Sequence, residues 1–261
     1  MSSGKLWRIF TPIFAVAMLV VCAAPVSAQK SETKEKPAMY TYVANWALPR
    51  AQWADMAKSN ADDAKVLDKA ISNGTIVGYG SDENLVHSAD GATHDDWWSA
   101  TSMAGVLNVL AQFYQGGTVT SPVLSSATRH WDNIYVSHHY NWHPGSYKGA
   151  YTRIEGYKLK ADAPDEAVDT LSKNLIAPLL DKLISDGTVL EYEIDTEAIH
   201  TEDPGLFWIV FVTPNAEGQD KVLEAIRESM KSSPLLGPAF DSMVEYTAHR
   251  DYLNFSEGTY K

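Results

Sequence analysis

The chain has 261 residues, with 33 Asp and Glu against 21 Lys and Arg, and a formal net charge of −12 at neutral pH. Nucleic acids and anionic lipid surfaces attract basic patches, so this excess of acid argues against both as partners. The one cysteine, Cys22, excludes an intrachain disulfide and a metal site made of several thiolates.

The first 28 residues have the features of a secretory signal peptide. Lys5 and Arg8 precede an apolar stretch from Ile9 to Ala24, and small residues precede a cleavage position after Ala28. The apolar stretch is short and a Lys-rich segment follows it, which is not typical of a membrane span. We therefore expect a secreted or periplasmic protein without membrane attachment after cleavage, and a disordered segment over 29–38. Lipidation at Cys22 remains an alternative.

The rest of the chain contains the same pattern twice. The segments 66–80 and 179–193, which include LDKAISNGTIVGYG and LDKLISDGTVLEYE, are identical at eight of fifteen positions at an offset of 113 residues. The same offset relates His87 to His200 and Gly105 to Gly218. A constant offset over two units of this length indicates a tandem duplication. We expect repeat 1 over 39–148 and repeat 2 over 149–261.

Each repeat predicts the same order of elements. In repeat 1, strands are expected at 39–45, 75–80, 93–102 and 131–140, with helices before Asn73-Gly74 and over 103–114. In repeat 2, strands are expected at 150–156, 188–194, 206–213 and 242–253, with a helix ending at Asp186-Gly187 and another over 217–230. The order is β-α-β-β-α-β, which is the ferredoxin-like pattern.

Two such sheets can cover each other's open faces, so the chain resembles the dimeric α+β barrel superfamily with both halves on one polypeptide. The resemblance rests on element order and duplication and covers residues 39–261. It implies an α+β fold and a monomer with pseudo-twofold symmetry. Members of the superfamily include monooxygenases, haem-dependent chlorite dismutase-like and peroxidase-like proteins, and isomerases. No motif in this sequence selects one of them.

Alternation along the first strand of each repeat predicts which side chains line the barrel. We expect small and β-branched residues such as Thr41, Val43 and Ile154 to pack under the helices. The opposite face then points inward as a ligand-binding surface. That face carries aromatic residues and two charged residues as candidate catalytic groups: Tyr40, Tyr42, Trp46, Tyr151, Arg153, Glu155 and Tyr157. The alternatives are that the tyrosines only fill the interior and that Arg153 and Glu155 only pair with each other.

Histidines concentrate in repeat 1, which holds six of the eight. If Asp90-Gly91 forms a two-residue hairpin turn, His87 lies opposite His94. Asp96 is on the same strand face as His94, so the three side chains form a candidate metal or acid–base site. The alternative is a pair of solvated histidines near an exposed turn.

The third strands of the two repeats also differ. LFWIVFVT, over 206–213, is continuously apolar, which is typical of a strand buried on both faces, whereas THDDWWSATS, over 93–102, carries several polar side chains. We therefore expect any functional site in repeat 1, around His87, His94 and Asp96, with His138 or His139 nearby. A single histidine would suffice to ligate haem, but the sequence identifies no cofactor.

The sequence does not decide whether the protein is an enzyme. It lacks GxGxxG, Walker, GxSxG and CxxC motifs, which disfavours dinucleotide-binding, NTPase and nucleophile-elbow classes. Three classes stay open: an enzyme using His and carboxylate acid–base or metal chemistry on a small molecule, a non-catalytic ligand-binding protein, and a structural or interaction protein. A haem-binding oxidoreductase is a further alternative.

Overall fold

The computed structural model describes residues 36–261. The predicted signal peptide and most of the segment expected to be disordered lie outside the described residues. No helix within 36–261 is long and apolar enough to cross a membrane.

Repeat 1 contains four strands, two long helices and one short helix. Along the chain these are β1 (Met39–Ala47), α1 (Trp53–Ser72), β2 (Gly78–Asn84), β3 (His94–Ala100), α2 (Met103–Gly116), α3 (Pro122–Ser125) and β4 (Arg129–Trp142). The side chain of Ser102 accepts a hydrogen bond from Gly105 N at the start of α2, and Gly117 ends the helix with a φ of 77°. The predicted helix–strand order of this repeat is therefore present.

Repeat 2 follows the same order with additional helices. Its elements are β5 (Gly145–Lys158), α4 (Ala167–Leu171), α5 (Ala177–Ser185), β6 (Glu191–Glu197), β7 (Leu206–Thr213), α6 (Ala216–Ser232), α7 (Leu236–Met243) and β8 (Arg250–Tyr260). The prediction of a last strand over 242–253 was wrong, because its first residues belong to the end of α7 and to a 3-10 turn at Tyr246–Ala248. The strand instead extends to Tyr260, where each residue pairs with β2 or β5.

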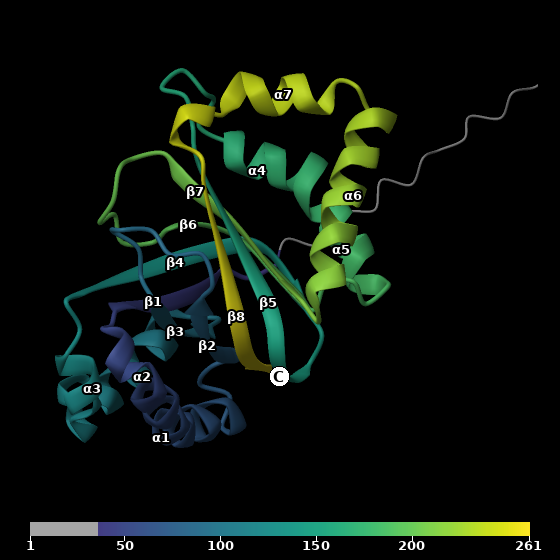
Figure 1. The fold of residues 1–261 in the computed structure, drawn as a ribbon. Coiled ribbons are helices and arrows are strands. Elements are labelled where there is room, and N and C mark those ends of the chain that lie inside the picture. The colour runs from purple at the N-terminus through teal and green to yellow at the C-terminus, as the bar shows by residue number, and fades with distance from the viewer. Residues whose placement is uncertain (1–35) are drawn as a thin grey trace, which may run out of the picture. The chain divides into compact units, whose positions relative to one another are not determined.

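The eight strands form one closed antiparallel barrel in the order β1-β3-β2-β8-β5-β7-β6-β4. Within each repeat the order is that of a ferredoxin-like sheet, and the pairs β2–β8 and β4–β6 join the two sheets. Figure 1 shows α1–α3 outside one side of the barrel and α4–α7 outside the other. The predicted fold, two tandem ferredoxin-like repeats closing into an intramolecular α+β barrel, is confirmed.

The core has three layers. One hydrophobic cluster lies between the repeat 1 strands and helices and includes Tyr42, Trp46 and Trp98. A second lies between the repeat 2 strands and helices and includes Tyr157, Phe207 and Phe240. The barrel interior is the third layer, and polar side chains reach into it.

The predicted orientation of the first strands was wrong by one residue. Thr41, Val43, Thr152 and Ile154 line the barrel interior, whereas Tyr42 and Trp46 pack against the helices. The prediction failed because both faces of these strands are buried, so polarity does not mark the inner one. In β1 and β5 the smaller side chains face the lumen, where rings from other strands take up the space, and the larger side chains of β1 lie under the helices.

Candidate functional site

A large cavity lies in repeat 1 between the strands and the helices α1 and α2. Its volume is about 1100 Å³. Tyr42, Trp46 and Trp98 contribute its aromatic wall from the sheet, and Trp53 and Phe113 face them from the helices. In repeat 2 the corresponding layer is filled, because Phe240 of α7 packs edge-on against Tyr157 at 5.1 Å between ring centroids.

Asp96 of β3 is a partly buried acid of this cavity. Burial, followed by the charges of Asp63 and Asp82, raises the pKa of Asp96 to about 8. Asp63 reaches the same cavity from α1, and burial raises its pKa to about 6. The indole N–H of Trp46 lies near Asp96 and partly offsets this rise in pKa. It makes no hydrogen bond to any of the described residues. At neutral pH Asp96 is therefore mainly a proton donor and Asp63 mainly a carboxylate.

His94 lies two residues before Asp96 on the same face of β3 and is 6% exposed. Burial lowers the pKa of its imidazole, against the opposing effect of Glu83. Its Nδ1 is 3.0 Å from Thr93 Oγ1, and its ring meets Trp53 edge-on at 5.4 Å. His94 is thus neutral at pH 7 and held between β3 and α1.

His130 of β4 forms the far wall of the cavity. Its ring stacks on Trp46 with centroids 3.7 Å apart, and its nitrogens lie 2.9 Å from Asn45 O and 3.1 Å from Asp132 Oδ1. Burial alone would lower the pKa of His130, but these two contacts outweigh burial and raise it. Both ring nitrogens are occupied, so His130 acts as a fixed wall rather than as a ligand.

The predicted pairing of His87 with His94 was wrong. His94 pairs with Glu83, and the connection between β2 and β3 is longer than two residues. His87 is exposed and contacts the ring of Trp53 at 5.2 Å. Within residues 36–261, no group of three or more His, Cys, Asp or Glu side chains is arranged to hold a metal ion. The prediction that His87 and His94 bind a metal ion therefore lacks a third ligand among the described residues.

The other predicted histidines lie away from the cavity. His138 is exposed, at the irregularity in the β4–β6 pairing. His139 Nε2 lies 3.0 Å from Asp169 Oδ1 of α4, on the repeat 2 side. These two side chains do not join His94 and Asp96.

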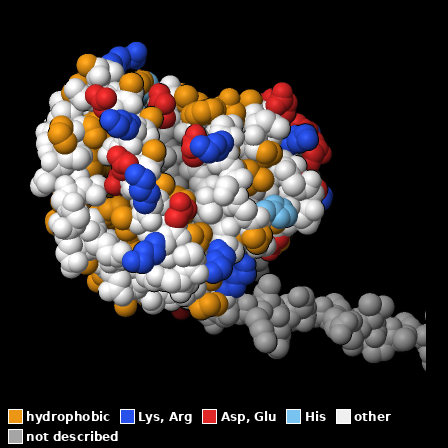
Figure 2. Space-filling view, turned by 90° about the horizontal axis from the view of Figure 1, so that it is seen from below, with side chains coloured by type: hydrophobic (Ala, Val, Ile, Leu, Met, Phe, Trp, Pro, Cys, Tyr) orange, Lys and Arg blue, Asp and Glu red, His pale blue; other side chains and the backbone are white. Residues whose placement is uncertain are grey.

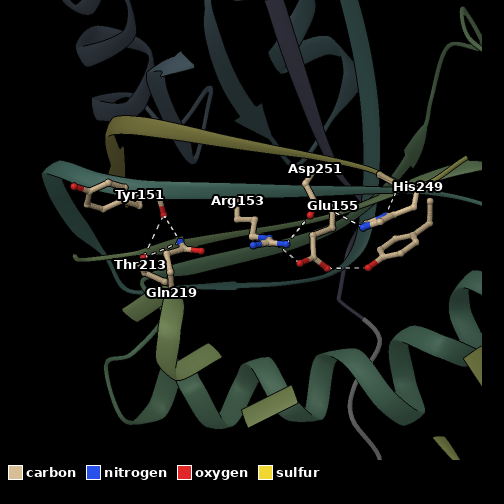
Figure 3. Close-up of polar contacts among 9 residues, drawn as sticks. Tyr151, Arg153, Glu155, Thr213, Gln219, His249 and Asp251 are labelled. Carbon is tan, nitrogen blue, oxygen red and sulfur yellow. Dashed lines mark hydrogen bonds and ion pairs between the residues drawn. The ribbon is translucent and has the colours of Figure 1, made fainter. Parts of the chain in front are cut away.

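Arg153 and Glu155 form an ion pair on the helix-facing side of β5 rather than inside the barrel (Figure 3). Arg153 Nε is 2.9 Å from Glu155 Oε1, and its terminal nitrogen is 2.6 Å from Asp251 Oδ2. Tyr157 donates to Glu155 Oε2 at 2.9 Å, and its ring stacks on His249. Each charge has a partner, so this network stabilises the contact of β5 with β8 and carries no free catalytic group.

The remaining predicted ligand residues are distributed among the outer layers. Tyr40 is partly buried against the repeat 1 core. The ring of Tyr151 contacts Phe255, while its carbonyl accepts from Gln219 of α6 (Figure 3). Of the aromatic residues expected to line one shared interior, Tyr42 and Trp46 line the repeat 1 cavity.

Sequence reasoning missed the acidic barrel interior. A second cavity of about 290 Å³ lies there, and its lining includes five buried carboxyl side chains, Asp82, Asp95, Glu191, Glu193 and Asp195. The signal was present in EYEIDTE, where an acid occupies every second position from Glu191 to Glu197. That spacing places all four acids on one face of a strand.

The outer face near α1 and α2 has no single charge sign. Figure 2 shows acidic and basic side chains interspersed with apolar ones on the face that it presents.

The fold is shared with solved structures. The chain is similar to a candidate monooxygenase from Lactobacillus acidophilus NCFM, with a TM-score of 0.60 and 12% identity over 85% of this chain and 94% of that chain. It is equally similar to a candidate monooxygenase from Fusobacterium nucleatum, with a TM-score of 0.60 and 8% identity over 86% of this chain and 95% of that chain.

No protein-family model and no curated protein matches the sequence. At such low identity the two structures speak for the fold alone. The closed barrel, its internal duplication and these matches together show that the chain has the fold of a dimeric α+β barrel, with both halves on one polypeptide.

Proposed function

We propose that the protein binds a mainly aromatic small molecule in the repeat 1 cavity and that Asp96 serves there as a general acid–base group. The observation that carries the proposal is a partly buried, proton-bearing carboxyl at the wall of a large aromatic cavity. Such a combination of apolar walls, few polar groups and a displaced pKa is typical of ligand and active sites. We place this activity in a secreted or periplasmic protein on the strength of residues 1–28.

The charges of the lining restrict the ligand. Six carboxyl side chains border the cavity. Its one lysine, Lys148, lies 3.1 Å from one of them, Glu257. A neutral or cationic aromatic compound suits this lining better than an anion.

Haem does not fit these residues well. Its two propionates would enter a cavity bordered by carboxylates. Only one histidine of the lining could ligate the iron: His94 has a ring nitrogen without a hydrogen bond, whereas both nitrogens of His130 are occupied. We therefore propose no step through haem.

The protonation states define the chemistry. With a pKa of about 8, Asp96 holds a proton at neutral pH and can give it to an oxygen or nitrogen of a ligand. Neutral His94, two residues away, can accept a proton through Nε2. The aromatic rings exclude water and hold a planar ligand against β3.

Binding is tested by thermal shift and calorimetry with three naphthalene probes: 2-naphthol, 2-naphthylmethylamine and 2-naphthoate. We expect the neutral and cationic probes to bind at least tenfold more tightly than the carboxylate. Ala64→Phe, which places a ring in the cavity from α1, should weaken binding at least tenfold. The matched control Ala111→Phe, on the exposed side of α2, should leave it unchanged. Equal binding by both variants would move the ligand elsewhere.

Catalysis is tested by product analysis and oxygen consumption with bound compounds, because the two structures of the same fold are candidate monooxygenases. Asp96→Asn should leave binding within about threefold and lower turnover on the order of 100-fold. We expect wild-type turnover to fall as pH rises through about 8, and this fall should be absent in Asp96→Asn. Unchanged turnover in Asp96→Asn would show that Asp96 is not the acid–base group. A Soret band on titration with haem would select the alternative oxidoreductase.

A further inference from the structure

The barrel interior is a second cavity with an unusual balance of charge, and Asp82 is the one residue that lines both it and the repeat 1 cavity. It is lined by the buried acids of β2, β3 and β6 and opens beside the β2–β3 connection at Asp90 to Ala92. Arg129, the one basic residue of the lining, is exposed at the rim and lies over Trp131 at 4.2 Å. Among the described residues that line the cavity, the buried carboxyls therefore face no buried cation.

Part of this acid stays ionised at neutral pH. Burial raises the pKa of Asp82 to about 6 and that of Glu193 to about 7, and hydrogen bonds partly offset the effect of burial in both. Burial raises the pKa of Asp95, Glu191 and Asp195 further. Asp82 and Glu193 are thus the interior acids that ionise most readily, and an uncompensated buried charge is costly.

Several buried acceptors also have no donor. Asn254 is 0% exposed, and neither of its amide atoms has a hydrogen-bond partner. Asn84, which pairs with Asn254 across β2 and β8, has an unpartnered Oδ1, and so do Glu191 at Oε1 and Asp195 at Oδ1. All four side chains line the cavity. Two amide oxygens and two carboxyl oxygens without partners call for a ligand with several N–H groups, whose positive charge also favours the ionised form of the carboxyls.

The remaining walls fit an organic cation. Trp97, Trp131 and Trp208 line the cavity together with three tyrosines, and aromatic faces attract ammonium groups. No three acids are grouped to coordinate a metal ion within residues 36–261. The cavity volume of about 290 Å³ suits a small molecule.

We infer that the barrel interior is a binding site for a small aliphatic ammonium ion, held by the inward carboxylates, by Asn84 and Asn254, and by the surrounding tryptophans. The ammonium N–H groups satisfy the unpaired acceptors, and its charge offsets the acids. Apart from Asp82, the lining of this site is not shared with the repeat 1 cavity, and the inference does not depend on the function proposed there.

The experiment is calorimetry of the full-length mature protein with putrescine, a four-carbon diammonium. Butane-1,4-diol serves as the neutral analogue of the same length, and MgCl₂ as the metal probe. We expect saturable one-to-one binding of putrescine that is at least tenfold tighter than that of the diol or of Mg²⁺. No saturable putrescine binding, or equal binding of the diol or Mg²⁺, overturns the inference.

Variants locate the site. Asp195→Asn and Asn254→Leu should each weaken putrescine binding at least tenfold, with folding checked by circular dichroism. Asp96→Asn, in the repeat 1 cavity, and Asp220→Asn, outside both cavities, should change it less than twofold. Loss of binding in Asp96→Asn alone would place the cation in the other cavity and overturn the assignment. If an interior variant does not fold, the wild-type comparison of putrescine with the diol decides.

Discussion

Single side chains connect strands that are not neighbours in the barrel. Tyr260 of β8 donates to Glu193 Oε1 of β6 at 3.1 Å, and Thr41 of β1 donates to Glu193 Oε2 at 3.0 Å. Ser256 of β8 donates to Asp82 and contacts Thr152 Oγ1 at 2.6 Å, which ties β8 to its neighbours β2 and β5. The two bonds to Glu193 cross the lumen, so this buried acid contributes to the geometry of the barrel as well as to its charge.

At the scale of the residue, Tyr260→Phe should destabilise the protein. It removes one of the two hydroxyl donors to Glu193, and a hydrogen bond to a charged group contributes about 1.5–3 kcal/mol. The pKa of Glu193 should rise further, because hydrogen bonding to its carboxylate holds it down. Urea unfolding measures the loss.

Tyr114→Phe is the control for that change. Its side chain is 62% exposed, so its free energy of unfolding should change by less than about 0.5 kcal/mol. Equal effects of the two substitutions would mean that the bond across the lumen contributes nothing.

At the scale of the element, aromatic rings pack closely against two glycines of β2. A Cβ at Gly80 of β2 would lie 2.5 Å from the Trp97 ring and 2.5 Å from the Glu257 carbonyl. At Gly78 a Cβ would lie 2.3 Å from the ring of Tyr260. The two glycines therefore let the rings of β3 and β8 occupy the lumen.

Gly80→Ala should lower the free energy of unfolding by about 2 kcal/mol, because the backbone carbonyl cannot move away from an added methyl group. Gly116→Ala, near the end of α2 with nothing closer than 4.0 Å, should instead stabilise by about 0.5–1 kcal/mol. Chemical denaturation of both variants distinguishes crowding in the lumen from a general intolerance of alanine.

The sequence predicted the element order because each repeat repeats its turns, caps and apolar spacing. It did not predict which face of the first strands points inward, because a strand with helices on one side and the closed lumen on the other is buried on both faces. Thr41 and Tyr42 are 6% and 5% exposed. Only the closure of the barrel decides which of them points inward.

The candidate site was predicted in part. His94 and Asp96 share a face because alternation is local, and both line the repeat 1 cavity. The predicted pairing of His87 with His94 was wrong because the length of a loop cannot be read from one Asp-Gly pair. The pKa of Asp96 depends on Asp63, which lies 33 positions earlier on α1. Such a contact has no signature in local sequence.

At the scale of the whole molecule, stability should fall as pH rises from 5 to 8. Between the unfolded value near 4 and its raised folded value, a buried carboxyl binds more protons in the folded protein, so the free energy of unfolding decreases with pH. The groups concerned are Asp63, Asp82, Asp96 and Glu193, with pKa values of about 6, 6, 8 and 7, together with Asp95, Glu191 and Asp195. The lowered pKa of His94 opposes this trend only below about pH 6.5.

We expect the melting temperature to drop by roughly 5 °C or more over this range. Glu193→Gln should flatten the dependence between pH 6 and 8, since its neutral amide does not titrate. A melting temperature that rises from pH 5 to 8 would contradict the burial of these acids.

The covalent joining of the two half-barrels has a consequence for how the interior can change. In a barrel assembled from two identical chains, each inward substitution is made twice and appears on opposite walls. Here Gly78 and Gly80 occupy the positions that Glu191 and Glu193 occupy 113 residues later. If both walls carried the glutamates, four would face the lumen and the rings of Trp97 and Tyr260 would have no room. A single chain can therefore combine an acidic wall with an opposite wall that has space for rings. A symmetric homodimer cannot have such a polarised interior.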